Sequence, residues 1–293
     1  MKNILVIYFT GTYHTEHLVN RIKKEKEKDG SSVSLLSVCS SSCVFDLSSF
    51  DEVIFSYPIY AFRAPKPYID YLRKLHFKKE AEYYVYKQSG EPFSYNNSSS
   101  CQIEKLLKKQ GCHLSGEFHF LYPYNILFAY DEEWKKKLKE YNDYEMTLAS
   151  YYTENHIQHL THCSFLKKKI TGLISHLQHF GSKINGPLYH VNKKKCTKCH
   201  LCLHQCPYQN ISLNKNGYPV FHSHCKMCMR CSYYCPKDCI KTGILNSIRI
   251  NHLTKADNKH RRIKTKFFSA YQKYIDKERE LYSSISAKND FSL

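Results

Sequence analysis

Short apolar runs alternate with longer amphipathic stretches through about the first 145 residues of the chain. The apolar runs are rich in β-branched and aromatic residues, which predicts five strands at 4–9, 33–38, 53–57, 83–86 and 114–120. Stretches with a helical pattern separate or follow them, at 14–28, 65–77, 98–110 and from 131 onward. Strands that alternate with helices form a parallel sheet with helices on both faces. We therefore expect a doubly wound α/β domain with a five-stranded parallel sheet.

A further helical pattern, at 151–180, contains five histidines. Three of them lie three residues apart: His156, His159 and His162. They form either a metal-binding face or, as we expect for a polar helix, a set of solvated side chains. The segment at 181–187 is rich in glycine and polar residues and ends in proline, which predicts a linker. We place the first domain at 1–180 and the linker at 181–189.

Eight of the 14 cysteines form one ligand pattern twice. The pattern is C-x2-C-x2-C-x3-C-P, and its cysteines are Cys196, Cys199, Cys202 and Cys206, then Cys225, Cys228, Cys231 and Cys235. Bacterial two-cluster ferredoxins have this pattern, and in them the fourth cysteine of each copy ligates the other cluster. We therefore expect two [4Fe-4S] clusters with crossed ligands. One has Cys196, Cys199, Cys202 and Cys235, and the other has Cys206, Cys225, Cys228 and Cys231.

Structural zinc is the alternative, because zinc sites built from four cysteines also use C-x2-C pairs. Zinc sites need neither the third cysteine nor the C-P ending, and both occur twice here. The other six cysteines are scattered and are expected to be buried or idle thiols: Cys39, Cys43, Cys101, Cys112, Cys163 and Cys239. We expect a small α+β bacterial-ferredoxin-like domain at 190–245 and a basic tail at 246–293.

Charge and hydropathy indicate which partner and which cellular location to expect. With 44 Lys and Arg against 26 Asp and Glu, the formal net charge is +18, which two clusters of about −2 each would reduce to about +14. A basic surface favours an acidic partner protein. The first apolar run is too short for a signal peptide, and no segment has the ~18–20 consecutive apolar residues of a membrane span. We expect a cytoplasmic protein without a membrane-spanning segment.

A loop of hydroxyl residues follows the first predicted strand and precedes a predicted helix, at 10–15. Such a loop offers backbone amides, hydroxyls and a helix N-terminus to a phosphate. It lacks the Gly-Lys-Ser/Thr ending of nucleoside-triphosphate loops and the G-x-G-x-x-G of dinucleotide-binding folds. A threonine-rich helix cap is the alternative.

With this loop in place, the sequence resembles the flavodoxins, and more narrowly flavodoxin-like proteins fused to a two-cluster ferredoxin, over about residues 1–255. The matching stretches are 8–15, 57–65, 89–92 with 96–100, and 123–128. In that family the first loop holds the FMN phosphate, and loops after the third and fourth strands flank the flavin ring. The resemblance implies phosphate contacts from Thr10, Gly11, Thr12, His14 and Thr15. It implies ring contacts from Pro58, Ile59, Tyr60, Ala61, Ser89 and Gly90.

The chain departs from the family pattern at two positions of the first loop. Tyr13 stands where the family usually has glycine, and His14 stands where asparagine is common. A flavodoxin fold that has lost its flavin is therefore the alternative to an FMN site.

Iron–sulfur clusters beside a flavin predict an electron carrier, in which electrons pass between the clusters and FMN or an external partner. A flavin-dependent reductase of a small substrate is the alternative within the same chemistry, although no general acid or nucleophile stands out in the sequence. A zinc- or nucleic-acid-binding module is an alternative of another class, suggested by the basic tail around 259–262. We do not expect nucleic acid as a partner, because no recognised module accompanies that tail.

Overall fold

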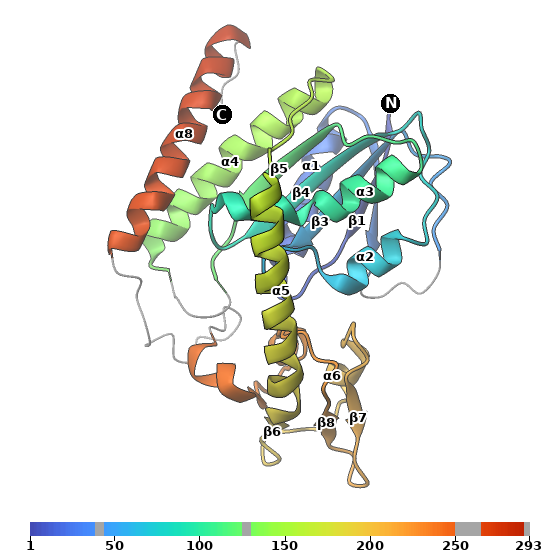
Figure 1. Ribbon diagram of the computed structural model, residues 1–293, viewed down its shortest axis with the longest axis vertical. Coiled ribbons are helices and arrows are strands. Elements are labelled where there is room, and N and C mark those ends of the chain that lie inside the picture. Colours follow the sequence, from blue (N-terminus) through green and yellow to red (C-terminus); the bar gives the residue numbers. More distant parts are fainter. Residues whose placement is uncertain (39–43, 125–129, 250–264, 290–293) are drawn as a thin grey trace.

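The computed structural model describes residues 1–38, 44–124, 130–249 and 265–289 (Figure 1). It consists of a sheet domain and a smaller cysteine-rich domain, and helix α5 (Phe165–Asn185) runs from one to the other. No helix within these ranges is long and apolar enough to cross a membrane.

Five parallel strands form the sheet, in the order β2-β1-β3-β4-β5. Their bounds are β1 Asn3–Tyr8, β2 Ser32–Ser37, β3 Glu52–Pro58, β4 Glu82–Ser89 and β5 Gly116–Leu121. This strand order is that of the flavodoxin-like doubly wound fold, with its topological switch point between β1 and β3. The predicted fold class is confirmed, and each predicted strand overlaps an observed one.

Helices cover both faces of the sheet: α1 (His14–Lys28), α2 (Lys66–Leu72), α3 (Cys101–Lys109) and α4 (Glu132–Glu154), with a 3-10 helix, η1 (Ser94–Ser99), before α3. Helices α2 and α3 pack on one face, and α1 and α4 pack on the other. Adjacent residues of β1 belong to opposite cores, since Leu5 faces α2 and α3 while Val6 faces α1 and α4, and both are fully buried. Burial on both faces explains why the sequences of the central strands β1 and β3 are nearly continuous apolar runs.

The helix predicted at 151–180 is wrong in its middle, because residues 155–164 are not helical. α4 ends at Glu154, and His156 follows with a positive φ of 52°, a conformation that ends helices. His159 instead forms a backbone bridge to Gly116 at the start of β5. The three regularly spaced histidines therefore do not share a helix face.

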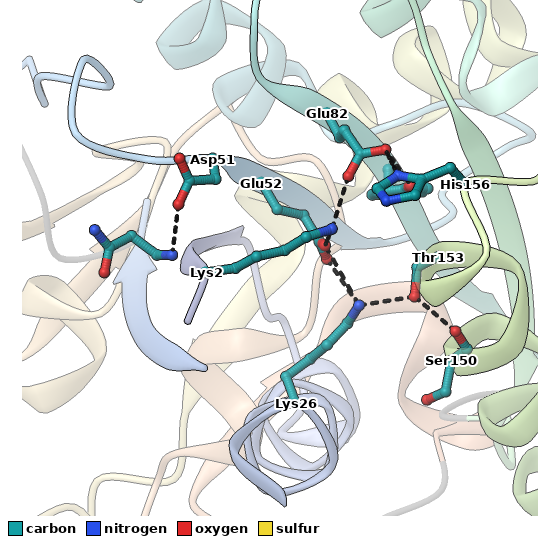
Figure 2. Close-up of polar contacts among 10 residues, drawn as sticks. Lys2, Lys26, Asp51, Glu52, Glu82, Ser150, Thr153 and His156 are labelled. Atoms are coloured by element: carbon teal, nitrogen blue, oxygen red, sulfur yellow. Dashed lines mark hydrogen bonds and ion pairs between the residues drawn. The ribbon is translucent and has the colours of Figure 1, made fainter. Parts of the chain in front are cut away.

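His156 belongs to a polar network at the amino ends of the strands (Figure 2). Its Nδ1 lies 2.7 Å from Glu82 Oε1, and Lys2 Nζ lies 2.9 Å from Glu82 Oε2. Beside them the buried Lys26 of α1 pairs with the buried Glu52 of β3 at 3.0 Å. These charges tie helices to central strands at the end of the sheet opposite the predicted binding loops.

The linker predicted at 181–187 is instead helical as far as Asn185, and a 3-10 turn, η2 (Gly186–Leu188), follows. A Cβ on Gly186 would lie 2.5 Å from the His222 carbonyl and 2.6 Å from the Cys225 side chain. This glycine therefore reflects close packing of the helix end against the cysteine-rich domain.

The cysteine-rich domain contains two short antiparallel strand pairs: β6 (Tyr189–Val191) with β9 (Ile240–Thr242), and β7 (Ile211–Leu213) with β8 (Pro219–Phe221). Each cysteine motif contains a one-turn helix, and a 3-10 helix follows β9: α6 (Leu201–His204), α7 (Arg230–Tyr233) and η3 (Gly243–Ile248). The predicted small α+β domain is thus observed, with a core in which cysteines pack against Tyr189, Ile211 and Ile240.

The tail contains a helix, α8 (Thr265–Asn289), which lies beside α4 (Figure 1). Tyr271 and Ile275 are buried against Trp134 and Tyr141 of α4. Residues 265–289 of the predicted basic tail therefore form a helix that contributes to the core.

Candidate functional site

The two cysteine motifs adopt the same backbone conformation. Positive φ occurs on either side of the second cysteine of each motif, at Lys198 and His200 and at Met227 and Met229. Non-glycine residues in this region are uncommon, cost on the order of 1–2 kcal/mol each, and concentrate at functional sites. Successive turns of this kind direct backbone amides toward one point and bind anions. A cluster with its four thiolates is such an anion, so the repeated strain indicates a binding loop in each motif.

The cysteines line two separate cavities. The ligand candidates that line the first are Cys196, Cys199, Cys202 and Cys235. The second is lined by Cys206, Cys225, Cys228 and Cys231. In each cavity one motif supplies three thiols and the other motif supplies the fourth. These are the two sets of four that the sequence predicts.

The eight cysteines of the two motifs all lie within the described ranges. In those ranges no three His, Cys, Asp or Glu side chains are grouped as they would be around a single metal ion. Burial raises the pKa of the Cys202 thiol to about 11, so its thiolate form requires the positive charge that iron supplies.

Cys239 lies against the first cavity as well. Its Sγ is 3.4 Å from Cys235 Sγ, and its backbone N–H donates to that sulfur at 3.5 Å. In the other half of the domain, the Asn210 N–H donates to Cys206 Sγ at 3.4 Å. Cys239 therefore occupies the position of Asn210 and supplies a hydrogen bond to a ligand, the kind of contact that tunes a cluster's potential.

A third cavity, of about 220 Å³, lies at the carboxyl ends of β3, β4 and β5, where doubly wound sheets bind ligands. Seven residues that the family resemblance implied line it: His14, Pro58, Ile59, Tyr60, Ala61, Ser89 and Gly90. Five others from the sheet domain were not implied as contacts: Gln88, Glu91, Tyr122, Pro123 and Tyr124. Residues 125–128, which also contributed to the resemblance, lie outside the described residues.

Fixed polar groups form one wall of this third cavity. Ser89 Oγ lies 2.8 Å from His119 Nε2, and burial, followed by the charge of Lys87, lowers the pKa of His119 to about 3. Gln88 is 5% exposed, and its Nε2 donates to Thr15 Oγ1 at 2.7 Å, while its Oε1 has no hydrogen-bond partner among the described residues. A buried amide group with one free end is suited to a polar ligand.

Gly90, in the second predicted ring loop, is held from two distant segments. Its carbonyl accepts hydrogen bonds from Tyr130 at 3.0 Å and from Tyr271 of α8 at 2.7 Å. A Cβ at this position would lie 2.8 Å from the Tyr124 ring. The backbone of the loop is therefore fixed, and the glycine is required by the close approach of an aromatic ring.

The predicted phosphate loop is at the interface between the two domains. Four of its residues are buried beside the third cavity rather than in its wall: Thr10, Gly11, Thr12 and Thr15. Arg230 of the second cysteine motif is 6% exposed and donates to the Thr10 carbonyl at 2.7 Å. A Cβ on Gly11 would lie 2.8 Å from the Cys228 carbonyl and would collide with the Tyr60 hydroxyl. The cysteine-rich domain thus closes over this loop.

Tyr13, the departure from the family pattern, has a role at this interface. Its ring stacks on Tyr234 with centroids 4.2 Å apart, and the Arg230 guanidinium lies 4.3 Å from the Tyr234 centroid on that ring's face. The Tyr234 hydroxyl also donates to Glu16 at 3.3 Å. The backbone at Tyr13 has φ of 68°, so the position retains the conformation that favours glycine while its side chain binds the other domain.

The third cavity and the second cysteine cavity share a wall. Met227, Cys228 and Met229 line the third cavity, and Cys228 and Met229 also line the second cysteine cavity. A thiol expected to bind a cluster is therefore in the wall of the cavity expected to hold a flavin.

Comparison with family models identifies the smaller domain. Residues 188–236 match the model of the 4Fe-4S dicluster domain. We call the cysteine-rich domain the dicluster domain after this match. The match contains all eight paired cysteines, and the chain therefore joins a flavodoxin-like domain to a dicluster domain. No curated protein matches the sequence.

Solved structures similar to the chain cover about half of it. A mutant flavodoxin of Fusobacterium nucleatum bound to flavin mononucleotide is 18% identical, with 43% of this chain and 78% of that chain covered and a TM-score of 0.33. Oxidised flavodoxin 1 of Bacillus cereus is 12% identical, with 50% of this chain and 97% of that chain covered and a TM-score of 0.37. Rubredoxin oxygen:oxidoreductase of Desulfovibrio gigas is 10% identical, with 52% of this chain and 37% of that chain covered and a TM-score of 0.36. The strand order, and not these low scores, establishes the fold.

The residues at the site that were not predicted from the sequence include Gln88, Arg230 and Tyr271. Gln88 directly precedes the predicted contact Ser89, and Arg230 directly precedes the ligand candidate Cys231. Position beside a predicted site residue was the only available signal for these two, and Tyr271 offered none.

Proposed function

We propose that this protein is an electron carrier in which two [4Fe-4S] clusters of the dicluster domain exchange electrons with an FMN in the third cavity. The observation that carries this proposal is the shared wall, because Cys228 and Met229 line both that cavity and the second cysteine cavity. The cluster on Cys206, Cys225, Cys228 and Cys231 is then proximal to the flavin. FMN, when bound, exchanges one or two electrons, whereas each cluster exchanges one.

The residues at the third cavity fit FMN in three respects. The cavity lies at the carboxyl ends of β3, β4 and β5, where doubly wound sheets bind ligands. The buried amide of Gln88 has one end available for a polar edge of the ring. At the other end of the ligand, the N-terminus of the 15-residue α1 and the Arg230 guanidinium provide positive potential for the phosphate beside the loop at 10–15.

The distal cluster, on Cys196, Cys199, Cys202 and Cys235, is the expected entry point for electrons. Cys199 is exposed. Exposed lysines surround it in sequence: Lys193, Lys194, Lys195 and Lys198. They provide a positive surface that an acidic redox partner recognises, and they accelerate its association at low ionic strength.

Anaerobic purification with iron, sulfide and flavin analysis tests the composition, for which we expect about eight irons and one FMN per chain. Stopped-flow mixing with a reduced acidic plant-type ferredoxin tests the path. In Cys206→Ala, which removes the predicted fourth ligand of the proximal cluster, flavin reduction should slow at least about tenfold while FMN content is unchanged. Equally fast flavin reduction in that variant, or zinc in place of iron and sulfide, would contradict the proposal.

A second candidate, a flavin-dependent reductase of an anionic substrate, is favoured by two observations. Glu91 lines the third cavity, and burial raises the pKa of its carboxyl group, as in a general acid. A fourth cavity of about 420 Å³ shares Tyr60, Ala61 and Gln178 with the third. Its charged lining is entirely basic: Arg63, Lys66, Arg73, Lys105 and Lys226.

The reductase is tested by anaerobic reoxidation of the reduced protein with a panel of small phosphorylated and carboxylated oxidants. If one is a substrate, Glu91→Gln should lower kcat by about 10² or more, and Lys226→Gln should raise KM because an anionic group loses its counter-charge. Reoxidation rates that both variants leave unchanged would favour the carrier alone.

A further inference from the structure

Helix α5 carries an exposed apolar stripe along its whole length. Large apolar side chains on it are exposed to between 38% and 72%: Phe165, Leu166, Leu173, Ile174, Leu177, Phe180 and Ile184. In Figure 1 this helix lies at the front of the molecule and spans both domains. Single exposed apolar residues are ordinary, but a continuous stripe on one helix indicates an interaction surface.

The stripe has the spacing of a coiled-coil seam. Steps of four and three residues alternate through Leu166, Ile170, Leu173, Leu177, Phe180 and Ile184. Three heptads fit the helix, with Ile170, Leu177 and Ile184 at the a positions and Leu166, Leu173 and Phe180 at the d positions. β-branched residues at a with leucine at d favour two-stranded coils.

We propose that α5 pairs with α5 of a second copy of this chain in a parallel two-stranded coiled coil. The opposite face of the helix already packs on its own chain, since Thr171, Ser182 and Asn185 are buried. These residues fall at b and f positions, which point away from the partner in a two-stranded coil. The bulk of each copy therefore lies on the side of α5 remote from the seam, and pairing meets no obstruction from the helix's own domains.

The exposed area is sufficient for a dimer. At roughly 150–200 Å² for a fully exposed large apolar residue, the observed exposures leave roughly 500–700 Å² of apolar surface on the seam and Ile174 of each copy. Two copies would bury about 1,000–1,400 Å², which reaches the lower part of the range of specific protein–protein interfaces. The helix of 21 residues is about 30 Å long, which accommodates three heptads.

The flanking charges favour the parallel arrangement. Lys169, His176 and Lys183 occupy the g positions, while Ile174 and Gly181 occupy e positions. In a parallel coil g faces e of the other copy, which places Lys169 beside Ile174 and His176 beside Gly181. In an antiparallel coil g faces g, which places Lys169 opposite Lys183, and this like-charge contact disfavours it.

An interfacial membrane helix is the other use of a basic amphipathic helix. The seam, however, consists of the two heptad positions of a coiled coil, which is narrower than the apolar face of a helix that lies in a bilayer. A second copy of α5 has the same apolar residues at the same heptad positions and is therefore the partner that fits this seam.

The test is sedimentation equilibrium of the anaerobically purified full-length protein, whose monomer mass is 34.6 kDa. We expect twice that mass for the wild type. Leu173→Glu combined with Leu177→Glu should raise the dimer dissociation constant at least about 100-fold, and Phe165→Glu, on the same helix but outside the seam, should leave it within about threefold. Because all three side chains are exposed, iron and flavin content should not change and serve as the folding control.

Orientation is tested by cross-linking Leu166→Cys with a short bis-maleimide, against the wild type as background. A parallel coil brings the two introduced thiols together, whereas an antiparallel coil separates them by most of the helix length. A monomeric wild type, a dimer that the double variant leaves intact, or sedimentation of the monomer with anionic phospholipid vesicles would overturn the proposal.

Discussion

At the scale of single residues, several positions serve both domains at once. Tyr13 keeps a glycine-like backbone conformation in the phosphate loop and stacks on Tyr234 of the dicluster domain. Arg230 donates to the Thr10 carbonyl and, at 2.9 Å, to Gln205 Oε1 of the first cysteine motif. A buried guanidinium needs such acceptors, and two anionic clusters nearby would lower the cost of burying it further.

Tyr13 can be tested by comparing two substitutions. Tyr13→Ala removes the stack but keeps the strain of positive φ, whereas Tyr13→Gly removes the stack and releases the strain. We expect Tyr13→Ala to be destabilised by about 1–2 kcal/mol, which lowers Tm by about 3–6 °C, and Tyr13→Gly by about 1 kcal/mol less. Differential scanning fluorimetry of anaerobic protein measures this. A lower Tm for Tyr13→Gly than for Tyr13→Ala would show that strain is unimportant there.

His119 predicts an acid-sensitive contribution to stability. Its pKa is lowered from 6.5 to about 3 by burial and by Lys87, so the unfolded chain binds a proton at higher pH than the folded chain does. Its contribution is therefore complete above pH 6.5 and is lost progressively as the pH falls toward 3, by about 1.4 kcal/mol per pH unit.

The measurement is Tm at pH 7.5 and 5.5. We expect the fall in Tm over this range to be smaller in His119→Gln than in the wild type. His76→Gln, at an exposed position, is the matched control and should behave as the wild type. Equal falls in all three proteins would show that His119 is not the group responsible.

At the scale of elements, the sheet and the cluster ligands were predictable because both are short-range patterns. Buried parallel strands require continuous apolar runs, and three ligands of each cluster come from one short loop. The break at 155–164 was not predictable, since the residues on both sides are helix formers and tertiary pairing of His159 with Gly116 competes with the helix. Contacts between distant segments, such as Arg230 with Thr10, 220 residues apart, leave no local pattern in one sequence.

The crossed arrangement of ligands is tested by three cysteine substitutions. Cys206→Ala and Cys235→Ala each remove the fourth thiol of a different cavity, so each should lose about four of eight irons. Cys239→Ala should keep about eight, because Cys239 lies 3.4 Å from Cys235 Sγ as a neighbour of the ligand. Iron and acid-labile sulfide analysis after anaerobic purification measures this, and iron loss in Cys239→Ala equal to that in Cys235→Ala would mean that the fifth thiol is a ligand.

At the scale of the whole molecule, the third cavity is assembled from the length of the chain. Its wall combines loops at the ends of three strands, Gln178 of α5 and residues 227–229 of the dicluster domain. Behind that wall, Tyr271 of α8 reaches the Gly90 carbonyl from 181 residues away. Closure of one domain over the other fixes the phosphate loop, while Tyr130, just before α4, and Tyr271 of α8 together fix the second ring loop.

The hydrogen bond from α8 to the second ring loop can be tested separately from the packing of α8 on α4. Tyr271→Phe keeps the buried ring against Trp134 but removes the hydroxyl that donates to Gly90 at 2.7 Å, leaving Tyr130 as the donor that remains among the described residues. We expect Tm to fall by about 2–4 °C, as for one hydrogen bond of ~1 kcal/mol, and FMN affinity to fall about threefold to tenfold because the loop backbone is less fixed.

Fluorescence titration of flavin-free protein with FMN measures the affinity. Tyr282→Phe, farther along α8, is the control, since Tyr282 packs on Tyr144 of α4 with ring centroids 4.9 Å apart and does not line the third cavity. Both variants should retain their iron, because neither residue touches the dicluster domain's ligands. If FMN affinity falls equally in both, α8 acts on the flavin loop through its packing on α4; if it falls only in Tyr271→Phe, the hydrogen bond to Gly90 is the connection.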